Sequence, residues 1–396
     1  VVQIGPTATV SSFAQRLGRS GRRSGTARAI LVATDEGTLL QCLGLSYLIA
    51  EGKTESVKPG CFEAHILVHQ ILALSLEREK ADLEGAWQTL HGAFPFRDVN
   101  EAHYRCLLKH LEAREFLRQI RSKYTAGCEM ERRFGHRNFR DFIAVFDARE
   151  GFAVKWGNRS IGFVDPSFAL SQKGLDALVL GGQRWRVLKI DNVTKIISVA
   201  PADNARLVSW NSEPQAVSFL LARGMARVVE GMDPHCDTAE FATALQRIRL
   251  RYRQLSFNAR RICVYDSAQH INVLTFAGHL LNMTIGVLLA HRMGIHFGVS
   301  ATRVTVSSPR TDVDCDAVAG QLRALKTMSM EEVEELLRSS IRSLPKPYKI
   351  GKYFDLLPPS LQEELLIHKL VDASGLHNFL ATVDVVYDQP AELNHL

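Results

Sequence analysis

The chain has 396 residues, of which 46% are hydrophobic and 23% are charged, so it has the composition of a folded protein and the length of two to four domains. Its formal net charge of +6 favours polyanionic partners without identifying one. No run of about 18 apolar residues occurs, so we expect no membrane span. The seven cysteines lie far apart without a CxxC pair, which favours free thiols in a reducing, cytoplasmic environment over a disulfide scaffold.

Residues 1–57 alternate short apolar runs with helical patterns in the order strand, helix, strand, helix. That order is typical of a parallel α/β layer. Asp35 stands where an N-cap would begin the second helix. Because the chain opens on VVQIGP, with neither a methionine nor a signal peptide, we expect it to be part of a longer protein.

The pattern then changes to helices alone, and three of them are followed by the short extended SKYTAG. This order predicts a winged-helix domain over residues 58–138, with a plain helical bundle as the alternative. From residue 139 to 212 the short strands FIAVF, GFAVKWG, SIGFVD, RWRVLKID and KIISVAPA are separated by turn residues, which predicts a small β-barrel or sandwich.

Helices return from residue 213, together with the strand-like RICVYDS and ATRVTVSS, so residues 213–345 are predicted to form an α/β region. Residues 346–396 are predicted to form a helical tail, because PPSLQEELLIHKLV reads as a helix opened by proline. The predicted fold is therefore multidomain, α/β and α+β.

The stretch SSFAQRLGRSGRRSG, residues 11–25, concentrates four arginines and three glycines at the end of a predicted helix. Arg19 and Arg22 are three residues apart, which would put them on one face of a helical turn, and Gly18 removes side-chain bulk beside them. Two planar guanidinium groups arranged in this way can hold one phosphate. The alternative is a basic loop stabilised by the negative end of the helix dipole.

The pattern QxxGRxGR, from Gln15 to Arg22, resembles motif VI of superfamily 2 helicases, the arginine-finger motif of their second RecA-like domain. The segments RRFGHRNFRDFIAVF, IGFVDPSF, GGQRWRVLKID and LTFAGHLLNMTIGVLLA are similar to the region beyond the winged helix in the large helicase-related (Lhr) family. The resemblance covers most of the chain. It implies that residues 1–57 end a RecA-like helicase domain and that residues 139–212 are the β-barrel of the Lhr-specific region.

By this resemblance, Arg19 and Arg22 contact the γ-phosphate of ATP, while Gln15 positions the nucleotide and Gly18 permits its close approach. The parent enzyme would hydrolyse ATP with Mg²⁺, move along single-stranded DNA and unwind DNA or RNA:DNA duplexes. The motor loop GxxxxGK[ST] and a DExH pair are both missing; YLIAEGKT matches the loop only at its end, with Tyr47 at the first glycine position. We therefore expect the ATP-binding half to lie upstream and this chain alone to be inactive.

The segment ERRFGHRNFRDF interleaves arginines with rings that could stack on unpaired bases; these are Arg132, Arg133, Arg137 and Arg140 with Phe134, His136, Phe139 and Phe142. The combination suits single-stranded nucleic acid. The alternative places the phenylalanines in a core and leaves the arginines solvated. Of the tryptophans in the strand-rich part, Trp156, Trp185 and Trp210, the last two are our candidates for exposed stacking platforms.

Other signals are weaker. LQRIRLRYRQL carries arginines at positions 247, 249, 251 and 253, which spread around a helix and favour a solvated surface. Asp312, Asp314 and Asp316, and the pair His235 and Cys236, lack partner ligands at metal spacing, so no metal site is predicted. His279, His291 and His296 are expected to be packing residues.

Two other functions stay open from the residues alone. The chain can be a non-catalytic nucleic-acid-binding module, or a subunit that supplies its arginines to a separate ATPase chain. Nuclease or glycosylase chemistry has no carboxylate and histidine arrangement to support it.

Overall fold

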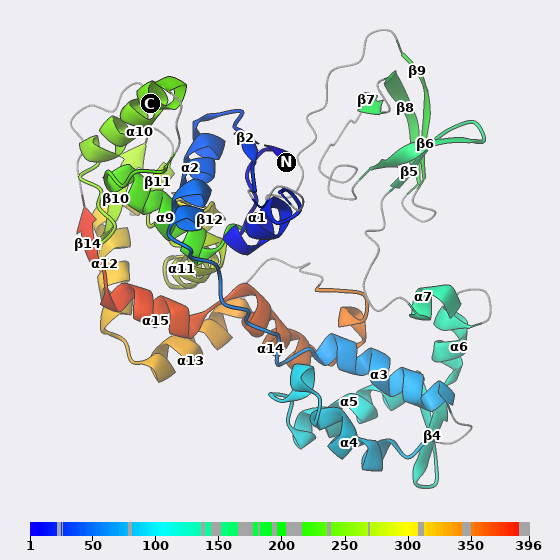
Figure 1. The fold of residues 1–396 in the computed structure, drawn as a ribbon. Coiled ribbons are helices and arrows are strands. Elements are labelled where there is room, and N and C mark those ends of the chain that lie inside the picture. The colour runs from blue at the N-terminus through cyan, green and yellow to red at the C-terminus, as the bar shows by residue number, and fades with distance from the viewer. Residues whose placement is uncertain are drawn as a thin grey trace.

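The computed structural model describes residues 1–21, 25, 27–77, 81–135, 139–143, 152–164, 177–180, 183–191, 196–202, 216–235, 239–267, 270–307, 313–342 and 350–387. Within these ranges helices and sheets are mixed, as the predicted fold class requires (Figure 1). None of the helices in the described ranges combines the length and the apolar composition that a membrane span needs.

The N-terminal part has the predicted order of strand, helix, strand and helix: β1 (Val2–Ile4), α1 (Val10–Leu17), β2 (Ile30–Val32) and α2 (Glu36–Ala50). The two strands pair in parallel. The hydroxyl of Thr9 caps α1 by accepting a hydrogen bond from the Ser12 N–H at 3.1 Å. Asp35 caps α2 as predicted, accepting from the Thr38 N–H at 2.8 Å.

The predicted winged helix is confirmed. Its elements are α3 (Ala64–Glu77), α4 (Leu83–His91), the 3-10 helix η1 (Phe94–Phe96), α5 (Glu101–Ala113), and the wing of β3 (Leu117–Ile120) and β4 (Lys123–Ala126). The wing strands are antiparallel, and an isolated bridge between Ala81 and Tyr124 joins them to the segment before α4. The helices α6 (Cys128–Phe134) and α7 (Phe139–Ile143) follow the wing.

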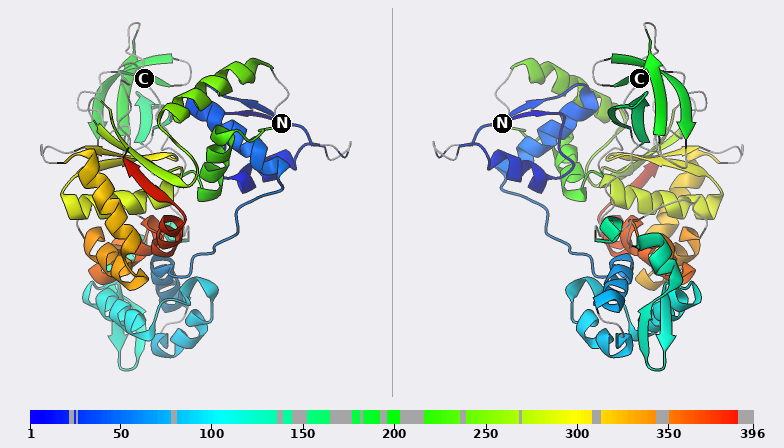
Figure 2. Two further views of the ribbon diagram at one scale, coloured as in Figure 1. Left: turned by 90° about the vertical axis from the view of Figure 1, so that its left-hand side faces the viewer. Right: turned by 90° about the vertical axis from the view of Figure 1, so that its right-hand side faces the viewer.

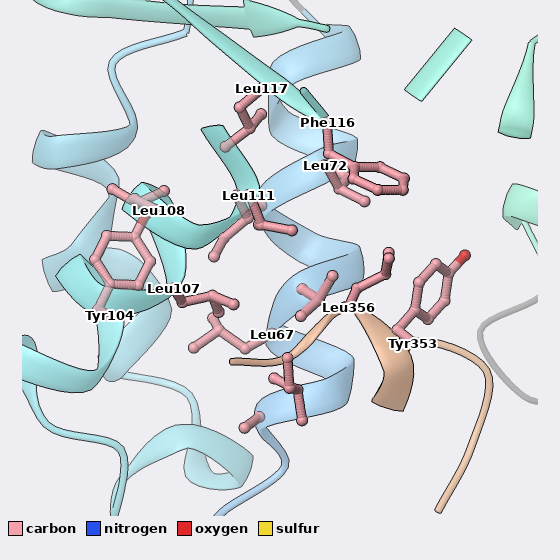
Figure 3. Packing of buried hydrophobic residues seen from close by; sticks show 14 of the residues in the cluster. Leu67, Leu72, Tyr104, Leu107, Leu108, Leu111, Phe116, Leu117, Tyr353 and Leu356 are labelled. Carbon is pink, nitrogen blue, oxygen red and sulfur yellow. The ribbon is translucent and has the colours of Figure 1, made fainter. Parts of the chain in front are cut away.

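The core of the winged helix is completed by a distant part of the chain. Leu67 and Leu72 of α3 pack with Leu107 and Leu111 of α5, and Tyr353 and Leu356 close this core from the side (Figure 3). Leu356 belongs to the 3-10 helix η2 (Phe354–Leu356), which leads into α14 (Pro359–Leu370). The Tyr353 hydroxyl donates to the backbone oxygen of Phe142 at 2.9 Å. The domain is therefore built from two separate segments, where a single range, 58–138, was predicted.

The segment FIAVF, predicted as a strand, begins in a helix instead. Phe142 lies in α7 and is 4% exposed, because its ring packs beside Phe134 and Tyr353 at centroid distances of 5.6 and 6.4 Å. Burial of these rings outweighs the strand preference of the local sequence. Residues 144–146 of the segment lie outside the described residues.

The strand-rich part is a five-stranded sheet, called here the curled sheet, and Figure 1 shows it set apart from the other elements. Its strands are β5 (Phe152–Trp156), β6 (Arg159–Val164), β7 (Ala177–Leu180), β8 (Gln183–Asp191) and β9 (Ile196–Pro201), in the order β6-β5-β9-β8-β7. A side chain at Gly162 of β6 would lie 3.1 Å from Leu180 of β7, so the two edge strands approach each other. No ladder between these edges is seen in the described ranges, so the sheet is a half-barrel, where a small β-barrel or sandwich was predicted.

The C-terminal part is a five-stranded sheet between two helical layers. Its strands are β10 (Arg261–Ser267), β11 (His270–Leu274), β12 (His296–Val299), β13 (Arg303–Ser307) and β14 (Asp384–Tyr387), in the order β12-β13-β11-β10-β14. Its helices are α9 (Phe219–Glu230), α10 (Ala239–Gln254), α11 (Gly278–Met293), α12 (Cys315–Thr327), α13 (Met330–Ile341) and α15 (Ala373–Ala381). Strand β14 corrects the predicted helical tail: its backbone pairs in parallel with β10, and Val385 packs against the sheet core.

Alternation along β10 shows which helices cover each face. Val264 packs with α11, α12 and α13, whereas its neighbours Cys263 and Tyr265 pack with α9, α10 and α2. Helix α2 of the N-terminal part therefore covers one face of the C-terminal sheet, and Figures 1 and 2 show these two parts side by side. The helices α2 and α9 meet at glycines, where a side chain at Gly44 would lie 3.1 Å from the backbone nitrogen of Met225. Helix α2 thus shares a hydrophobic core with the C-terminal sheet.

Candidate functional site

The predicted arginine site begins at the C-terminal end of α1. Val10 and Phe13 are buried, at 0% and 4% exposed, and this fixes the rotation of the helix about its axis. The opposite side of the helix end consequently faces solvent and carries Gln15, Gly18 and Arg19. A ligand held by another domain can be reached only from such an exposed surface. Arg22 lies outside the described residues.

The backbone between these residues differs from the predicted helical turn. The helix ends at Leu17 with Gly18 as its C-cap, and Arg19 lies in the following turn. Gly21 has a φ of 74°, a left-handed conformation that side chains with a Cβ rarely adopt. Arg19 therefore lies in a turn after the helix, where a helical turn was predicted, and its convergence with Arg22 stays a prediction.

Neighbouring residues hold this turn in place. Arg16 Nη1 donates to Gln3 Oε1 on β1 at 2.6 Å, which ties the helix end to the sheet. The Ser20 hydroxyl donates to the Leu17 oxygen at 2.7 Å and accepts from the Arg28 N–H at 3.0 Å. These contacts agree with a structural role for Arg16, whereas Arg19 is exposed in the turn.

The opposite end of α1 is held by Glu55, which lies in the segment between α2 and α3. Its carboxylate accepts from the backbone N–H groups of Val10 and Ser11, both at 2.8 Å. It also accepts from the hydroxyl of Ser218, the N-cap of α9, at 2.6 Å. One carboxylate thus joins two helix N-termini, where the macrodipole favours negative charge.

Glu55 makes the fold sensitive to acid. Burial alone would raise the pKa of Glu55, but the hydrogen bonds from Ser218, Ser11 and Val10 outweigh it and lower the pKa from 4.5 to about 2. A depressed pKa means that the stabilisation is complete above pH 4.5 and is lost as the pH falls towards 2. At neutral pH we expect Glu55→Gln to cost about 1–2 kcal/mol of unfolding free energy. Melting temperatures measured from neutral pH downwards should converge for the two proteins in acid.

The control for this prediction is Glu51→Gln, which removes an exposed carboxylate paired with the exposed Lys53 in the same segment. Its melting curve should follow the wild type at every pH. Equal curves for Glu55→Gln and Glu51→Gln would contradict the role given to Glu55.

A cleft of about 850 Å³ opens beside Arg16, between the N-terminal part and the C-terminal sheet. The residues that line this cleft include Asp35, Thr38, His279, Ser300 and Arg303. Burial lowers the pKa of His279, and its Nδ1 accepts from the Val217 N–H at 2.9 Å. The neutral ring therefore carries its proton on Nε2, as a hydrogen-bond donor.

The predicted nucleic-acid residues after the wing are engaged within the fold. Arg132 Nη2 pairs with Glu129 at 2.5 Å, and Arg133 Nη1 pairs with Asp355 at 2.7 Å. Phe134 and Phe142 are buried in the winged-helix core, so they cannot serve as the predicted stacking faces; Phe139 is 47% exposed. Arg137, His136 and the side chain of Arg140 lie outside the described residues.

The exposed tryptophan of the curled sheet is Trp156, where the prediction named Trp185. Trp185 is 2% exposed and its indole N–H donates to the Leu180 oxygen at 3.0 Å, so it belongs to the sheet core. Trp156 is 45% exposed at the end of β5, with its ring centroid 5.7 Å from that of Trp185. The arginines on either side of Trp185 favoured the wrong ring, whereas the position of Trp156 at a strand end accounts for its exposure. Trp210 lies outside the described residues.

The remaining signals have local explanations. Arg249 donates to the backbone oxygens of Val228 and Met232, and Arg251 pairs with Glu36 at 2.9 Å. Asp314 caps α12 by accepting from the Ala317 N–H. No cluster of three or more potential metal ligands occurs within the described ranges, which leave out Asp312 and Cys236.

Comparison with known proteins gives a family match for part of the chain. Residues 48–207 match the model of the winged helix domain of large helicase-related proteins. The predicted resemblance to the large helicase-related family is confirmed.

The chain is 26% identical over 247 residues to the ATP-dependent helicase Lhr-Core of Methanothermobacter thermautotrophicus, which is 59% of this chain and 28% of that protein. It is 20% identical over 229 residues to the Lhr helicase/uracil glycosylase of Escherichia coli, which is 55% of this chain and 15% of that protein. The chain thus spans only about a quarter or less of these curated relatives.

A solved structure shares the fold along almost the whole chain. Helicase Lhr of Mycobacterium smegmatis, solved bound to ssDNA and AMP-PNP, aligns with 99% of this chain and 55% of its own, with a TM-score of 0.59 and 15% identity. The large helicase-related architecture therefore extends beyond the matched winged-helix region to the parts on either side of it.

Proposed function

We propose that the chain is the C-terminal portion of an ATP-dependent DNA helicase that couples ATP hydrolysis to movement along single-stranded DNA. The observation that carries this proposal is the match of the winged helix to the large helicase-related model. In the complete protein, ATP and Mg²⁺ would be held mainly by another domain, and the parent enzyme would unwind DNA or RNA:DNA duplexes.

The N-terminal part supports the proposal because its sheet is incomplete. Parallel strands are normally covered on both faces, yet Val2, Ile4 and Ile30 are 65%, 74% and 63% exposed. A two-stranded parallel pair needs further strands or helices to be stable. We therefore assign residues 1–57 to the end of a RecA-like domain, with Arg19 and Arg22 as its arginine fingers, Gln15 near the nucleotide and Gly18 allowing its approach.

Trp156 is the side chain of the curled sheet that we assign to single-stranded DNA, because an exposed indole offers a stacking face to any base. We expect Trp156→Ala to weaken binding of a fluorescent single strand by about 1–3 kcal/mol, measured by anisotropy. Leu188→Ala is the matched control, since Leu188 is 58% exposed on β8 of the same sheet and has no aromatic face. An equal loss of affinity in both variants would show that Trp156 does not stack.

A further inference from the structure

The winged helix presents two surfaces with different charge. The exposed face of α5 carries Arg105 and Lys109, but Glu101 and Glu112 lie on the same helix, and Arg105 Nη2 pairs with Glu101 at 2.7 Å. The wing, residues 117–126, carries Arg118, Arg121 and Lys123 and has no acidic residue. The helix is therefore balanced in charge, whereas the wing is cationic.

The strand register turns the wing cations away from the core. Ile120 is opposite Lys123 and Arg118 is opposite Thr125, so Arg118 and Lys123 share one face of the hairpin. The other face carries Leu117 and Tyr124, which are 1% and 4% exposed. Arg121 lies in the turn between the strands, with a φ of 60°. All three cations are exposed.

The cations differ in their surroundings. Arg118 lines a hollow of about 530 Å³ together with Glu112, Glu115 and Glu131, so its charge is partly compensated. Arg121 and Lys123 lie beyond this hollow, and neither forms an ion pair with the part of the chain that the structure describes. These two residues, called here the wing tip, thus carry positive charge that no ion pair within the described ranges compensates.

We propose that the wing tip binds the phosphate backbone of duplex DNA, while α5 does not carry the main contact. The inference rests on the proposed function, because it requires a DNA substrate. Sites for single strands combine cations with aromatic stacking faces, but the wing's aromatic residue, Tyr124, is buried. A duplex instead presents closely spaced phosphates, about one charge per 1.7 Å, to a compact pair of cations. Such contacts position a protein on DNA without reading its sequence.

The test compares two double variants of the 396-residue chain, each of which removes two positive charges. R121Q with K123Q alters the wing tip, and R105Q with K109Q alters the exposed face of α5 as the matched control. Glutamine keeps a Cβ at position 121, so the strain of the positive φ is unchanged. Binding to a fluorescent duplex and to the corresponding single strand is measured by anisotropy over a range of salt concentrations.

For the duplex we expect the slope of log K against log salt to fall by about 1.8 in the wing-tip variant, since each lost phosphate contact contributes about 0.9. Affinity at about 50 mM salt should fall roughly tenfold or more. The α5 variant should keep a slope close to the wild type, and the single strand should be affected less than the duplex in the wing-tip variant.

Four outcomes overturn the inference. An equal effect of the two variants would show a general electrostatic response, and an equal loss for the single strand would refute the choice of duplex. If the wild-type chain binds neither DNA, the proposed function fails together with the inference. If the wild-type chain binds the duplex and the wing-tip variant keeps the same affinity and salt dependence, the inference is refuted while the proposed function stands. Melting temperatures of both variants confirm that they are folded.

Discussion

Replacing Arg22 with alanine in the full-length protein is expected to lower the turnover number for ATP by about 10³- to 10⁵-fold, the effect of losing an arginine finger. Arg19→Ala should act in the same direction, because Arg19 is exposed at the turn after α1. A guanidinium on the γ-phosphate stabilises charge that develops only in the transition state. Affinity for single-stranded DNA, measured by anisotropy, should therefore stay within about twofold, since neither arginine is assigned to the strand.

Arg16→Ala is the matched control, because it removes an arginine from the same helix end whose guanidinium is bonded to Gln3. Its turnover should stay within a few-fold of the wild type. If Arg19→Ala and Arg22→Ala both retain normal turnover, the arginine-finger assignment fails. If they lose DNA binding together with turnover, these arginines contact the strand and not the nucleotide.

The second large effect is expected where α2 crosses α9. A methyl group at Gly44 would lie 2.8 Å from Met225 Cγ and 3.1 Å from its backbone nitrogen, so the helices must separate. We expect Gly44→Ala to lower the unfolding free energy by about 1–3 kcal/mol, the cost of overpacking a core. Denaturant titration followed by circular dichroism measures the change.

Gly320→Ala should change the stability in the opposite direction. Gly320 also lies inside a helix, α12, but a methyl group there would meet no atom within 4 Å. The better helix propensity of alanine then raises the unfolding free energy by up to about 1 kcal/mol. If both substitutions stabilise the chain, the crossing of α2 and α9 is looser than the structure shows.

The sequence predicted the secondary structure correctly wherever the residues of one short segment determine it. Asp35 before an apolar helix, RICVYDS as β10 and the proline that opens α14 were all predicted correctly. The same holds for the winged helix, whose helices carry clear apolar spacing. The resemblance to motif VI was read from arginines and glycines, but the sequence did not show that the helix ends at Leu17 or that Gly21 adopts a left-handed conformation.

Errors arose where contacts between distant residues decide the structure. Phe142 was assigned to a strand and as a stacking face, but Tyr353, more than half the chain away, buries it in a helix. Trp185 was chosen over Trp156 as a surface ring, but the packing of the curled sheet buries Trp185 and leaves Trp156 exposed. The hydrogen bonds of Glu55 were not predicted for the same reason. Its partner Ser218 begins α9 and lies 163 residues away in the sequence.

The divided winged-helix core has a consequence for synthesis on the ribosome. Residues 64–143 emerge early, but Tyr353, Leu356 and Leu365, which complete the same core, emerge only after the curled sheet and most of the C-terminal sheet. The apolar faces of α3 and α5 consequently stay partly exposed to solvent while the intervening chain is translated. Exposed apolar surface favours aggregation at this stage. A domain formed by one continuous segment can fold as soon as that segment is translated. The winged helix can complete its core only after the residues that follow position 350 have been translated.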